Sequence, residues 1–478
     1  YLENSGYFSL VKYNSSGNLI WSKNYGVPFT EGLVSATSMV IDTGGSIYIS
    51  GEYNSKLLTL KYSGDGILIW SKFYSEQGND SNLKGGRIII SRSGALIVSS
   101  TIGTDGKIII LKYDLSGNLI WAKKLNQFSR NYYGAYRLAE DSNGNIYVAG
   151  KTAVTINTTD YLLIKLDHEG NYLWSKRQVS GDYPGPSPKL IIYNNMIYIV
   201  GNFLDVYYQK FIKLVKYNTN GEIVWEITDS GTILDDNEAK DVVIDAYGKV
   251  YVTGINSNIG TGIDCVTLKY SESGNLLWKK TYDSGINNTE YGDKITFDSE
   301  GNVYVGGSSV KSVLNGYDYL LLKYDNNGNF KWKQIFNGTG NSTDYLRDIA
   351  IDANGSVYVT GWTSSGFLNI TTLKFSQPIG IDPISSEIPS QFSLRQNYPN
   401  PFNPATKIKF AIPSGVASQT IFSVYDILGR EVAVLVNQQL RPGTYEVDWD
   451  ASAFQSGIYS YMLNSGPFKE TKKMILVK

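Results

Sequence analysis

Residues 294–334 read KITFDSEGNVYVGGSSVKSVLNGYDYLLLKYDNNGNFKWKQ, and most of the chain repeats this pattern. The stretch contains four short apolar runs, at 295–298, 303–307, 319–324 and 330–332. Gly301-Asn302 lies between the first two runs, and Gly328-Asn329 lies between the last two. Short runs of this kind, bounded by Asn, Asp or Gly, are typical of strands joined by tight turns. The stretch therefore predicts a unit of four antiparallel strands.

Tryptophan spacing gives the register of the repeat. Gaps of 49, 51, 53, 51, 53 and 54 residues separate Trp21, Trp70, Trp121, Trp174, Trp225, Trp278 and Trp332. The second run of most units has the form Ile/Val-Tyr-Ile/Val, with a Gly two positions on. A four-strand unit that recurs about every fifty residues is typical of β-propeller blades. We expect these tryptophans to pack one blade against the next, because burying a large ring is strongly stabilising.

The ends of the repeat bear on how the ring closes. Residues 7–25 supply only a third and a fourth strand, and residues 347–376 supply only strands one to three. Six complete units lie between them, near 36–74, 87–126, 137–178, 189–228, 241–282 and 293–336. The simplest interpretation is a seven-bladed propeller of four-stranded antiparallel blades, in which the Trp21 strand completes the sheet of residues 347–376. The alternative is an eight-bladed ring that lacks an N-terminal portion.

Tight turns of the form D-x-x-G-N, as in residues 141–145, join the first strand to the second and the third to the fourth. Gly supplies the left-handed backbone of such a turn, and Asp accepts hydrogen bonds from the turn amides. The start of this turn also resembles an EF-hand loop, which would bind calcium. A strand begins before the bidentate Glu of such a loop could occur, so we expect no cofactor or metal, with calcium possible but not favoured.

The links between strands four and one, and between strands two and three, are long and irregular, so a ligand is expected among them. Their aromatic residues are candidates for stacking on a sugar or for anchoring a protein, and simple packing of the loops is the alternative. The ligand-binding candidates are Trp362, Tyr207, Tyr208, Tyr132 and Tyr133. Loop carboxylates such as Glu290, Asp293 and Asp344 leave a glycosidase pair open, although solvated charge is the simpler explanation.

Composition excludes several classes of function. The formal net charge of −1 gives no basic excess to suggest nucleic acid, and no apolar run is long enough for a transmembrane helix. Cys265 and His168 are the only residues of their types, which excludes a multi-Cys or multi-His metal site and a His-based catalytic triad within this sequence. The chain starts at Tyr1 without a signal peptide, and we expect an N-terminus that has been processed or truncated.

The repeat ends near residue 376. A Pro- and Ser-containing stretch at 377–391 is typical of a linker, and the short strands predicted across 392–478 favour a small β-sandwich. This segment resembles the sorting domain of proteins exported by the bacterial type IX (Por) secretion system. The motif residues are Asn400, Pro401, Phe402, Asn403, Pro404, Gly429, Arg430, Lys472 and Lys473. The resemblance implies an immunoglobulin-like fold, the type IX translocon as a partner, and a secreted or cell-surface location.

The repeats themselves resemble the SBBP-type bacterial β-propeller repeat, with Asp141 to Gly150 a close instance. They also resemble, more loosely, the tryptophan-docked propellers of quinoproteins. Neither resemblance implies a catalytic residue. The leading hypothesis is a non-enzymatic binding or adhesion module with a surface glycan or protein as its ligand. The alternatives are a propeller enzyme, acting on polysaccharide or quinoprotein-like, and a structural module of a surface assembly.

Overall fold

The computed structural model describes most of the chain. The described residues are 7–14, 17–26, 34–76, 83–103, 107–125, 132–153, 159–182, 187–204, 209–229, 237–258, 260–285, 289–312, 316–338, 343–352, 355–364, 368–375, 384, 388–413, 419–440, 442–451 and 454–477. Within them, every regular element is a β-strand. The chain divides into two compact units, the second of which holds residues 373–478 together with short segments from 330–332 and 350–358. The predicted domain limits of 1–376, 377–391 and 392–478 stay a prediction.

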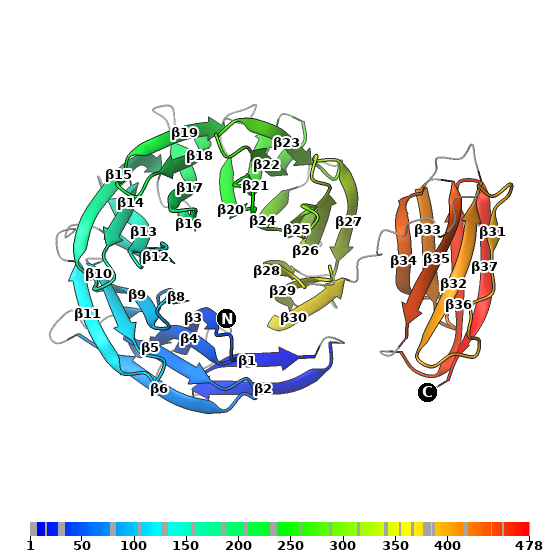
Figure 1. The fold of residues 1–478 in the computed structure, drawn as a ribbon, viewed down its shortest axis with the longest axis horizontal. Coiled ribbons are helices and arrows are strands. Elements are labelled where there is room, and N and C mark those ends of the chain that lie inside the picture. Colours follow the sequence, from blue (N-terminus) through cyan, green and yellow to red (C-terminus); the bar gives the residue numbers. More distant parts are fainter. Residues whose placement is uncertain are drawn as a thin grey trace. The chain divides into compact units, whose positions relative to one another are not determined.

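Consecutive antiparallel sheets build the propeller (Figure 1). A hairpin comes first, formed by β1 (Tyr7–Tyr13) and β2 (Leu19–Gly26). The next sheet is formed by β3 (Val34–Ile41), β4 (Ile47–Tyr53), β5 (Lys56–Tyr62) and β6 (Leu68–Tyr74). The one after it is formed by β7 (Leu83–Lys84), β8 (Ile88–Ile90), β9 (Leu96–Ile102), β10 (Lys107–Tyr113) and β11 (Leu119–Leu125). A further sheet is formed by β12 (Tyr132–Glu140), β13 (Ile146–Ala153), β14 (Thr159–Leu166) and β15 (Tyr172–Asp182).

Three further four-stranded sheets continue the series. The first is formed by β16 (Lys189–Tyr193), β17 (Met196–Leu204), β18 (Lys210–Tyr217) and β19 (Ile223–Asp229). The second is formed by β20 (Glu238–Ile244), β21 (Val250–Asn258), β22 (Gly262–Tyr270) and β23 (Leu276–Tyr282). The third is formed by β24 (Glu290–Phe297), β25 (Val303–Ser312), β26 (Gly316–Tyr324) and β27 (Phe330–Phe336). The last sheet has three strands, β28 (Tyr345–Ile351), β29 (Val357–Ser364) and β30 (Leu368–Phe375).

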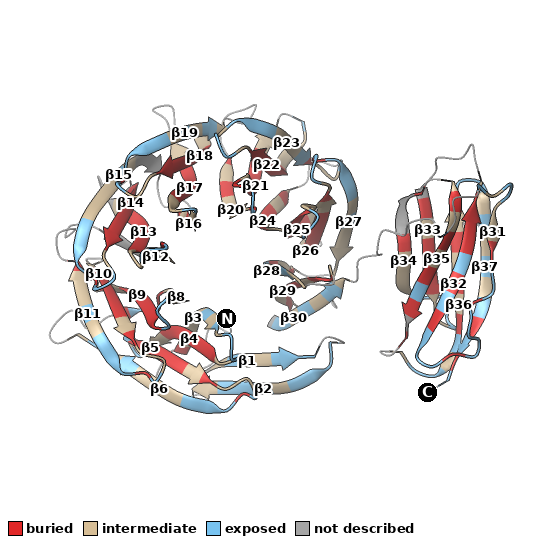
Figure 2. Ribbon diagram, in the orientation of Figure 1, coloured by how far each residue is buried: buried red, intermediate tan, exposed pale blue. Residues whose placement is uncertain are grey.

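The apolar core lies between neighbouring sheets. One cluster joins Val200 and Leu214 of one sheet to Val242 and Leu268 of the next. The middle strands are buried, while the fourth strands, such as β11 and β19, expose much of their length (Figure 2). The core is therefore divided into layers, and each layer belongs to two blades.

The predicted closure of the ring is wrong. The Trp21 strand, β2, pairs with β1 along seven residue pairs, and it does not pair with β30. The described residues from 7 to 375 form eight separate sheets, instead of seven completed blades. The physical reason is local, because β1 already supplies the third strand that pairs with β2 through a tight turn. The hairpin then packs as the outer half of a blade, with Trp21 and Leu10 against the core of β3–β6.

Five of the fourth-strand tryptophans donate a hydrogen bond to the following sheet. The indole N–H of Trp174 donates to the carbonyl oxygen of Thr219 at 3.2 Å, in the turn between the third and fourth strands of the next sheet. Lys165 lies opposite Trp174 in the ladder, and its ammonium donates to the same oxygen at 2.9 Å. The same pair of donations recurs at four other junctions, to the carbonyl oxygens of Gly64, Leu115, Glu272 and Asn326.

The turn that receives the indole must be narrow. Gly221 has a φ of +76°, and a Cβ placed there would lie 2.6 Å from Lys176 Cε and 3.2 Å from Trp174 Cη2. Only Gly adopts this backbone conformation readily and leaves room for the ring. The spacing of Gly and Trp in the sequence is thus set by a contact between two blades.

The Asp of the turn between strands one and two also has a structural role. Asp141 Oδ1 accepts the backbone N–H groups of Asn143 and Asn145, each at 2.9 Å. Asp141 Oδ2 accepts from the Asn145 amide at 2.8 Å and from the Tyr147 hydroxyl at 3.0 Å. Both oxygens are therefore used within the blade, which accounts for this Asp without a metal ion.

The C-terminal unit contains a two-sheet sandwich. One sheet has the order β31 (Ser393–Leu394), β32 (Ala405–Ile412), β35 (Gly443–Asp450), and the other has the order β34 (Glu431–Gln439), β33 (Gln419–Tyr425), β36 (Gly457–Ser465), β37 (Phe468–Leu476). A single core between the sheets includes Phe410, Phe422, Tyr445 and Tyr461. All the ladders of this unit are antiparallel.

We predict that Trp174 is a major determinant of propeller stability. Trp174→Ala removes a ring packed between two sheets and should lower the free energy of unfolding by about 3–5 kcal/mol. Trp174→Phe keeps part of the ring and should cost about 1 kcal/mol, because Lys165 still satisfies the Thr219 carbonyl. Denaturant unfolding of the full chain measures both changes. The exposed neighbour Leu173 is the control, and Leu173→Ala should change stability by less than about 0.5 kcal/mol. Equal stabilities for Trp174→Ala and Leu173→Ala would contradict this account.

Candidate functional site

The innermost strands are irregular at one shared position. The ladder between the first and second strands breaks between Ala36 and Ser38 in β3, between Ala239 and Asp241 in β20, and between Gly292 and Lys294 in β24. In the sheet of β9, the break is wider and separates β7 from β8 at residues 85–87. A β-bulge leaves one residue unpaired and re-aims its side chain. The unpaired residues are Thr37, Lys240 and Asp293.

A Gly on the second strand makes room for each bulge. A Cβ at Gly254 would lie 1.8 Å from the carbonyl oxygen of Glu238, and a Cβ at Gly307 would lie 1.7 Å from that of Tyr291. No other residue fits so close to the first strand. The Gly that follows the Ile/Val-Tyr-Ile/Val run therefore permits the bulge in the sheets of Gly51, Gly254 and Gly307.

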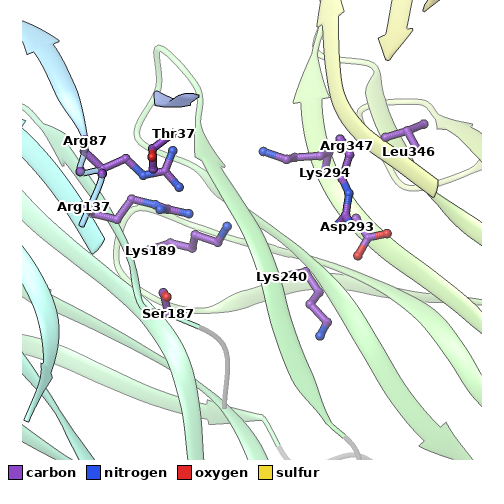
Figure 3. A pocket seen from close by; sticks show the side chains of 12 residues that line it. Thr37, Arg87, Arg137, Ser187, Lys189, Lys240, Asp293, Lys294, Leu346 and Arg347 are labelled. Atoms are coloured by element: carbon purple, nitrogen blue, oxygen red, sulfur yellow. The ribbon is translucent and has the colours of Figure 1, made fainter. Parts of the chain in front are cut away.

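These inner strands line a cavity of about 410 Å³. Its lining includes one basic residue from each of six successive sheets, namely Arg87, Arg137, Lys189, Lys240, Lys294 and Arg347. Asp293 is the one acidic residue of the lining. Figure 3 shows Arg87, Arg137 and Lys189 extending toward the space that Lys294 enters from another side. We refer to this space, with its six cations, as the basic cavity.

The cations of the basic cavity are close enough to affect one another. The pKa of Lys189 is lowered to about 8, chiefly by burial. Asp241 opposes this shift, and the charges of Arg137, Lys294 and Arg87 add to it. Burial also lowers the pKa of Arg137 to about 10, with Arg87 adding to the shift. A bound anion would favour the charged form of these groups and oppose the lowering of their pKa values.

Carboxylates offset part of this charge. Asp241 Oδ1 lies 3.7 Å from the Lys189 ammonium, and Asp348 Oδ1 lies 3.5 Å from that of Lys294. Burial raises the pKa of Asp293, although the surrounding lysines and Arg347 oppose the shift. The site is therefore basic, with one acidic residue in its lining.

A row of aromatic rings adjoins the basic cavity. Tyr291 lies 5.6 Å from Tyr317, Tyr317 lies 5.0 Å from Tyr345, and Tyr345 lies 4.9 Å from Trp362, as measured between ring centroids. The guanidinium of Arg347 lies 5.6 Å from the centre of the Tyr345 ring. Arg347 thus belongs both to the basic cavity and to the aromatic row. An anionic ligand with a flat apolar face could contact both.

The structure gives mixed information on the predicted ligand residues. Trp362 is half-buried at the end of the aromatic row, where it packs on Tyr345. Tyr207 and Tyr208 lie outside the described residues, as do the side chains of Tyr132 and Tyr133 in β12. None of these four tyrosines is placed by the structure in the basic cavity. Their role stays a prediction.

Sequence reasoning missed the cations, although a signal was available. Arg137, Lys189, Lys240, Lys294 and Arg347 recur in the first strands at nearly the spacing of the tryptophans. This signal is weaker than the tryptophan spacing, because the position holds Lys in some repeats and Arg in others and because acidic residues lie next to several of them. Periodicity also does not show that these side chains, which come from different sheets, line one cavity.

Two of the three motif segments of the C-terminal unit, the Asn-Pro-Phe-Asn-Pro segment and the terminal motif, lie together at its last strand. Asn400 Oδ1 accepts the backbone N–H of Ile475 at 2.9 Å, and Phe402 exchanges backbone hydrogen bonds with Ile475 and Val477 at 3.0 Å each. The turn before β34 contains Gly429, with a φ of +76°, and Arg430, whose Nε donates to Asp426 at 2.7 Å. The Asn-Pro-Phe-Asn-Pro segment is therefore held by the terminal motif that contains Lys472 and Lys473.

Family comparison agrees with the resemblances to the sorting domain and to the SBBP repeat. A model described as a secretion system C-terminal sorting domain matches residues 396–478. The chain ends in a type IX secretion sorting domain. A model described as a β-propeller repeat, of the SBBP type, matches residues 331–367. The sorting domain indicates export to the cell surface or secretion, with handling by the type IX system. In the part of the chain that the structure describes, no helix is long and apolar enough to cross a membrane.

Several known proteins are similar to this chain at low sequence identity. An uncharacterized WD repeat-containing protein of Acanthamoeba polyphaga mimivirus is 24% identical over 190 residues, which are 34% of this chain and 13% of that protein. PorZ, a surface component of the type IX secretion system of Porphyromonas gingivalis, has 13% identity and a TM-score of 0.42, over 96% of this chain and 62% of its own. The β-propeller domain of the trilobed protease from Pyrococcus furiosus has 10% identity and a TM-score of 0.42, over 73% of this chain and 96% of its own. These similarities concern the fold alone.

We predict that Lys189 titrates near pH 8 in the folded chain. Its ammonium loses a proton as pH rises through this value, so the positive charge of the basic cavity falls over the same interval. Asp241→Asn removes the nearest carboxylate and should lower the pKa of Lys189 further. Nuclear magnetic resonance of the lysine side chains measures both values, and Lys189→Arg identifies the signal. Titration near the ordinary lysine value in both proteins would show that the cations do not share one enclosed site.

Proposed function

We propose that this chain is an exported, non-enzymatic binding protein that holds an anionic ligand in the basic cavity of its propeller. The observation that carries the proposal is the set of six cations contributed by six successive inner strands. Each cation alone could be a solvated side chain. Together they line one space with a single lining carboxylate, and the charges of their neighbours help to lower the pKa values of Lys189 and Arg137. Pre-arranged charge of this kind favours an anion whose binding removes the repulsion.

The ligand class that fits best is an acidic saccharide that carries carboxylate or sulfate groups. A volume of about 410 Å³ accommodates a small ligand or the end of a longer chain. Guanidinium groups bind carboxylate and sulfate through paired N–H donors, and Arg87, Arg137 and Arg347 provide three of them. The aromatic row beside Arg347 adds a surface on which a sugar ring can stack.

A polysaccharide-acting enzyme is the second candidate. Asp293 favours it, because a buried carboxyl with a raised pKa can exchange a proton with substrate. A hydrolase of the common type needs two carboxyl groups on either side of the bond that it cleaves. The lining supplies Asp293 alone, so binding without cleavage is the simpler function. Among the described residues, we find no contact that specifically favours a quinoprotein-like oxidoreductase or a structural module of a surface assembly.

The sorting domain completes the proposal for the whole chain. We propose that its sandwich is immunoglobulin-like and that the type IX translocon recognises the surface formed by the Asn400–Phe402 segment and β37. The hydrogen bonds of Asn400 and Phe402 to this strand support a shared surface, because they join the two motifs of the family. The propeller would then act outside the cell, on a soluble or surface-bound glycan.

Charge removal in the basic cavity tests the proposal. The full chain should bind a sulfated or carboxylated polysaccharide, such as heparin or alginate, and should not bind a neutral glucan. Arg137→Gln and Lys189→Gln should each weaken binding about tenfold or more, since a lost charge-assisted hydrogen bond costs about 1.5–3 kcal/mol. Binding should also weaken as pH rises through about 8, where Lys189 loses its charge. Calorimetry or biosensor titration measures the affinities.

The matched control is Lys23→Gln, which removes the same charge from an exposed position on β2. Its affinity should equal that of the unsubstituted chain. Equal losses for Lys23→Gln and Lys189→Gln would mean that the polysaccharide responds to net charge and not to the basic cavity. Release of shortened or unsaturated saccharides during incubation, abolished by Asp293→Asn, would instead establish the enzymatic alternative.

A further inference from the structure

Three carboxylates meet at the loop end of the sheet that contains β22. Asp264 is the third residue of β22, Asp283 follows β23, and Glu290 is the first residue of β24. One oxygen from each lies within 4.8 Å of the others. The side chains of Asp264 and Glu290 are 1% and 0% exposed, and Asp283 is half-buried. A parallel bridge between Ile263 and Thr289 holds the two segments together.

In each of the two buried carboxylates, donors hold one oxygen and leave the other without a partner. Asp264 Oδ2 accepts from the Asn258 amide at 2.6 Å and from the Thr261 hydroxyl at 2.7 Å. Glu290 Oε1 accepts from the hydroxyls of Ser284 at 2.7 Å and Ser309 at 3.3 Å. Asp264 Oδ1 and Glu290 Oε2 have no hydrogen-bond partner, although both are fully enclosed. Buried carboxylate oxygens without a donor are unfavourable unless a cation or a proton lies between them.

Neighbouring blades show how the same position is satisfied when no cation is needed. Asp344 occupies the position of Glu290 in the next sheet, and its two oxygens accept the backbone N–H groups of Gly338 at 2.6 Å and Ser364 at 3.2 Å. One sheet earlier the position is Asn237, a neutral residue that pairs with Asn256 at 2.8 Å. Glu290 departs from both patterns, because its Oε2 has no hydrogen-bond partner and its carboxylate lies close to two others.

We propose that Asp264, Asp283 and Glu290 form a divalent cation site that takes calcium. The donors are all oxygens, which suits a hard cation, and three carboxylates supply the charge that calcium sites in proteins commonly use. Water would complete the six to eight ligands that calcium prefers. The hydroxyl and amide groups on the other carboxylate oxygens fix the orientation of the ligands. Bound calcium would join β22, the end of β23 and the start of β24. β24 is the inner strand that carries Asp293 and Lys294 of the basic cavity.

Calcium titration of the metal-free chain tests this site. The full chain is dialysed against a chelator and titrated with CaCl₂ by calorimetry, and its thermal unfolding is recorded with and without calcium. We expect one calcium ion per chain, bound in the range of extracellular calcium modules, with a dissociation constant of about 0.1–1 mM or tighter. Saturating calcium should raise the melting temperature. Asp264→Asn and Glu290→Gln should each weaken calcium binding about tenfold or more and reduce the shift.

Two comparisons keep this test decisive. In metal-free buffer, Asp264→Asn and Glu290→Gln should melt at or above the temperature of the unsubstituted chain, because each removes a repelling charge. If either fails to fold, Asp283→Asn replaces it, since that side chain is only half-buried. Asp318→Asn is the matched control at the same position of β26 and should leave calcium affinity unchanged. Absence of heat and of any melting shift up to about 10 mM CaCl₂ would overturn the proposal, as would a shift that Glu290→Gln and Asp283→Asn retain.

Discussion

At five junctions between sheets, one carbonyl oxygen accepts from both a tryptophan and a lysine, and this contact determines how those blades follow one another. At the Trp174 junction, an indole N–H and an ammonium both donate to Thr219 O, and a Gly turn below the ring leaves no room for a side chain. The lysine also lies over the ring of Tyr147, on the second strand of its own sheet, at 5.4 Å. Each contact thus continues across a sheet from Tyr to Lys to Trp and then into the next blade. A propeller held in this way depends on neighbouring contacts, as in other repeat proteins.

This outer attachment leaves the inner strands free to vary. A Gly on the second strand, such as Gly254 or Gly307, permits a bulge in the first strand and turns Lys240 or Asp293 into the central space. The residues that repeat most faithfully therefore hold the blades together, while the side chains at the bulges differ from blade to blade. Five of the six cations come from consecutive sheets that share the same tryptophan spacing. A ligand site formed in this manner depends on the whole ring, because no single blade supplies more than a small part of it.

Sequence alone predicted the strands, the tight turns and the sorting domain, because each depends on local residues. The D-x-x-G-N pattern, as in Asp141, Gly144 and Asn145, favours a tight turn through local contacts, and the Trp spacing gives the length of the repeat unit. Ring closure could not be predicted in this way. The Trp21 strand was equally suited to pair with β30 or with the hairpin partner beside it, and the short link to β1 decided the outcome. The basic cavity was missed for a related reason. Alternation along a strand assigns side chains to faces, and a bulge at Lys240 or Asp293 breaks that alternation.

The central claim is that the inner strands, and not the outer turns, receive the ligand. A crystal structure of the full chain with a sulfated disaccharide tests this most directly. The account predicts sulfate oxygens within hydrogen-bond distance of Arg137 and Lys189, with the sugar ring near Arg347 and Tyr345. A saccharide bound at the turns around Asn118 or Asn329, with no saccharide in the basic cavity, would contradict it.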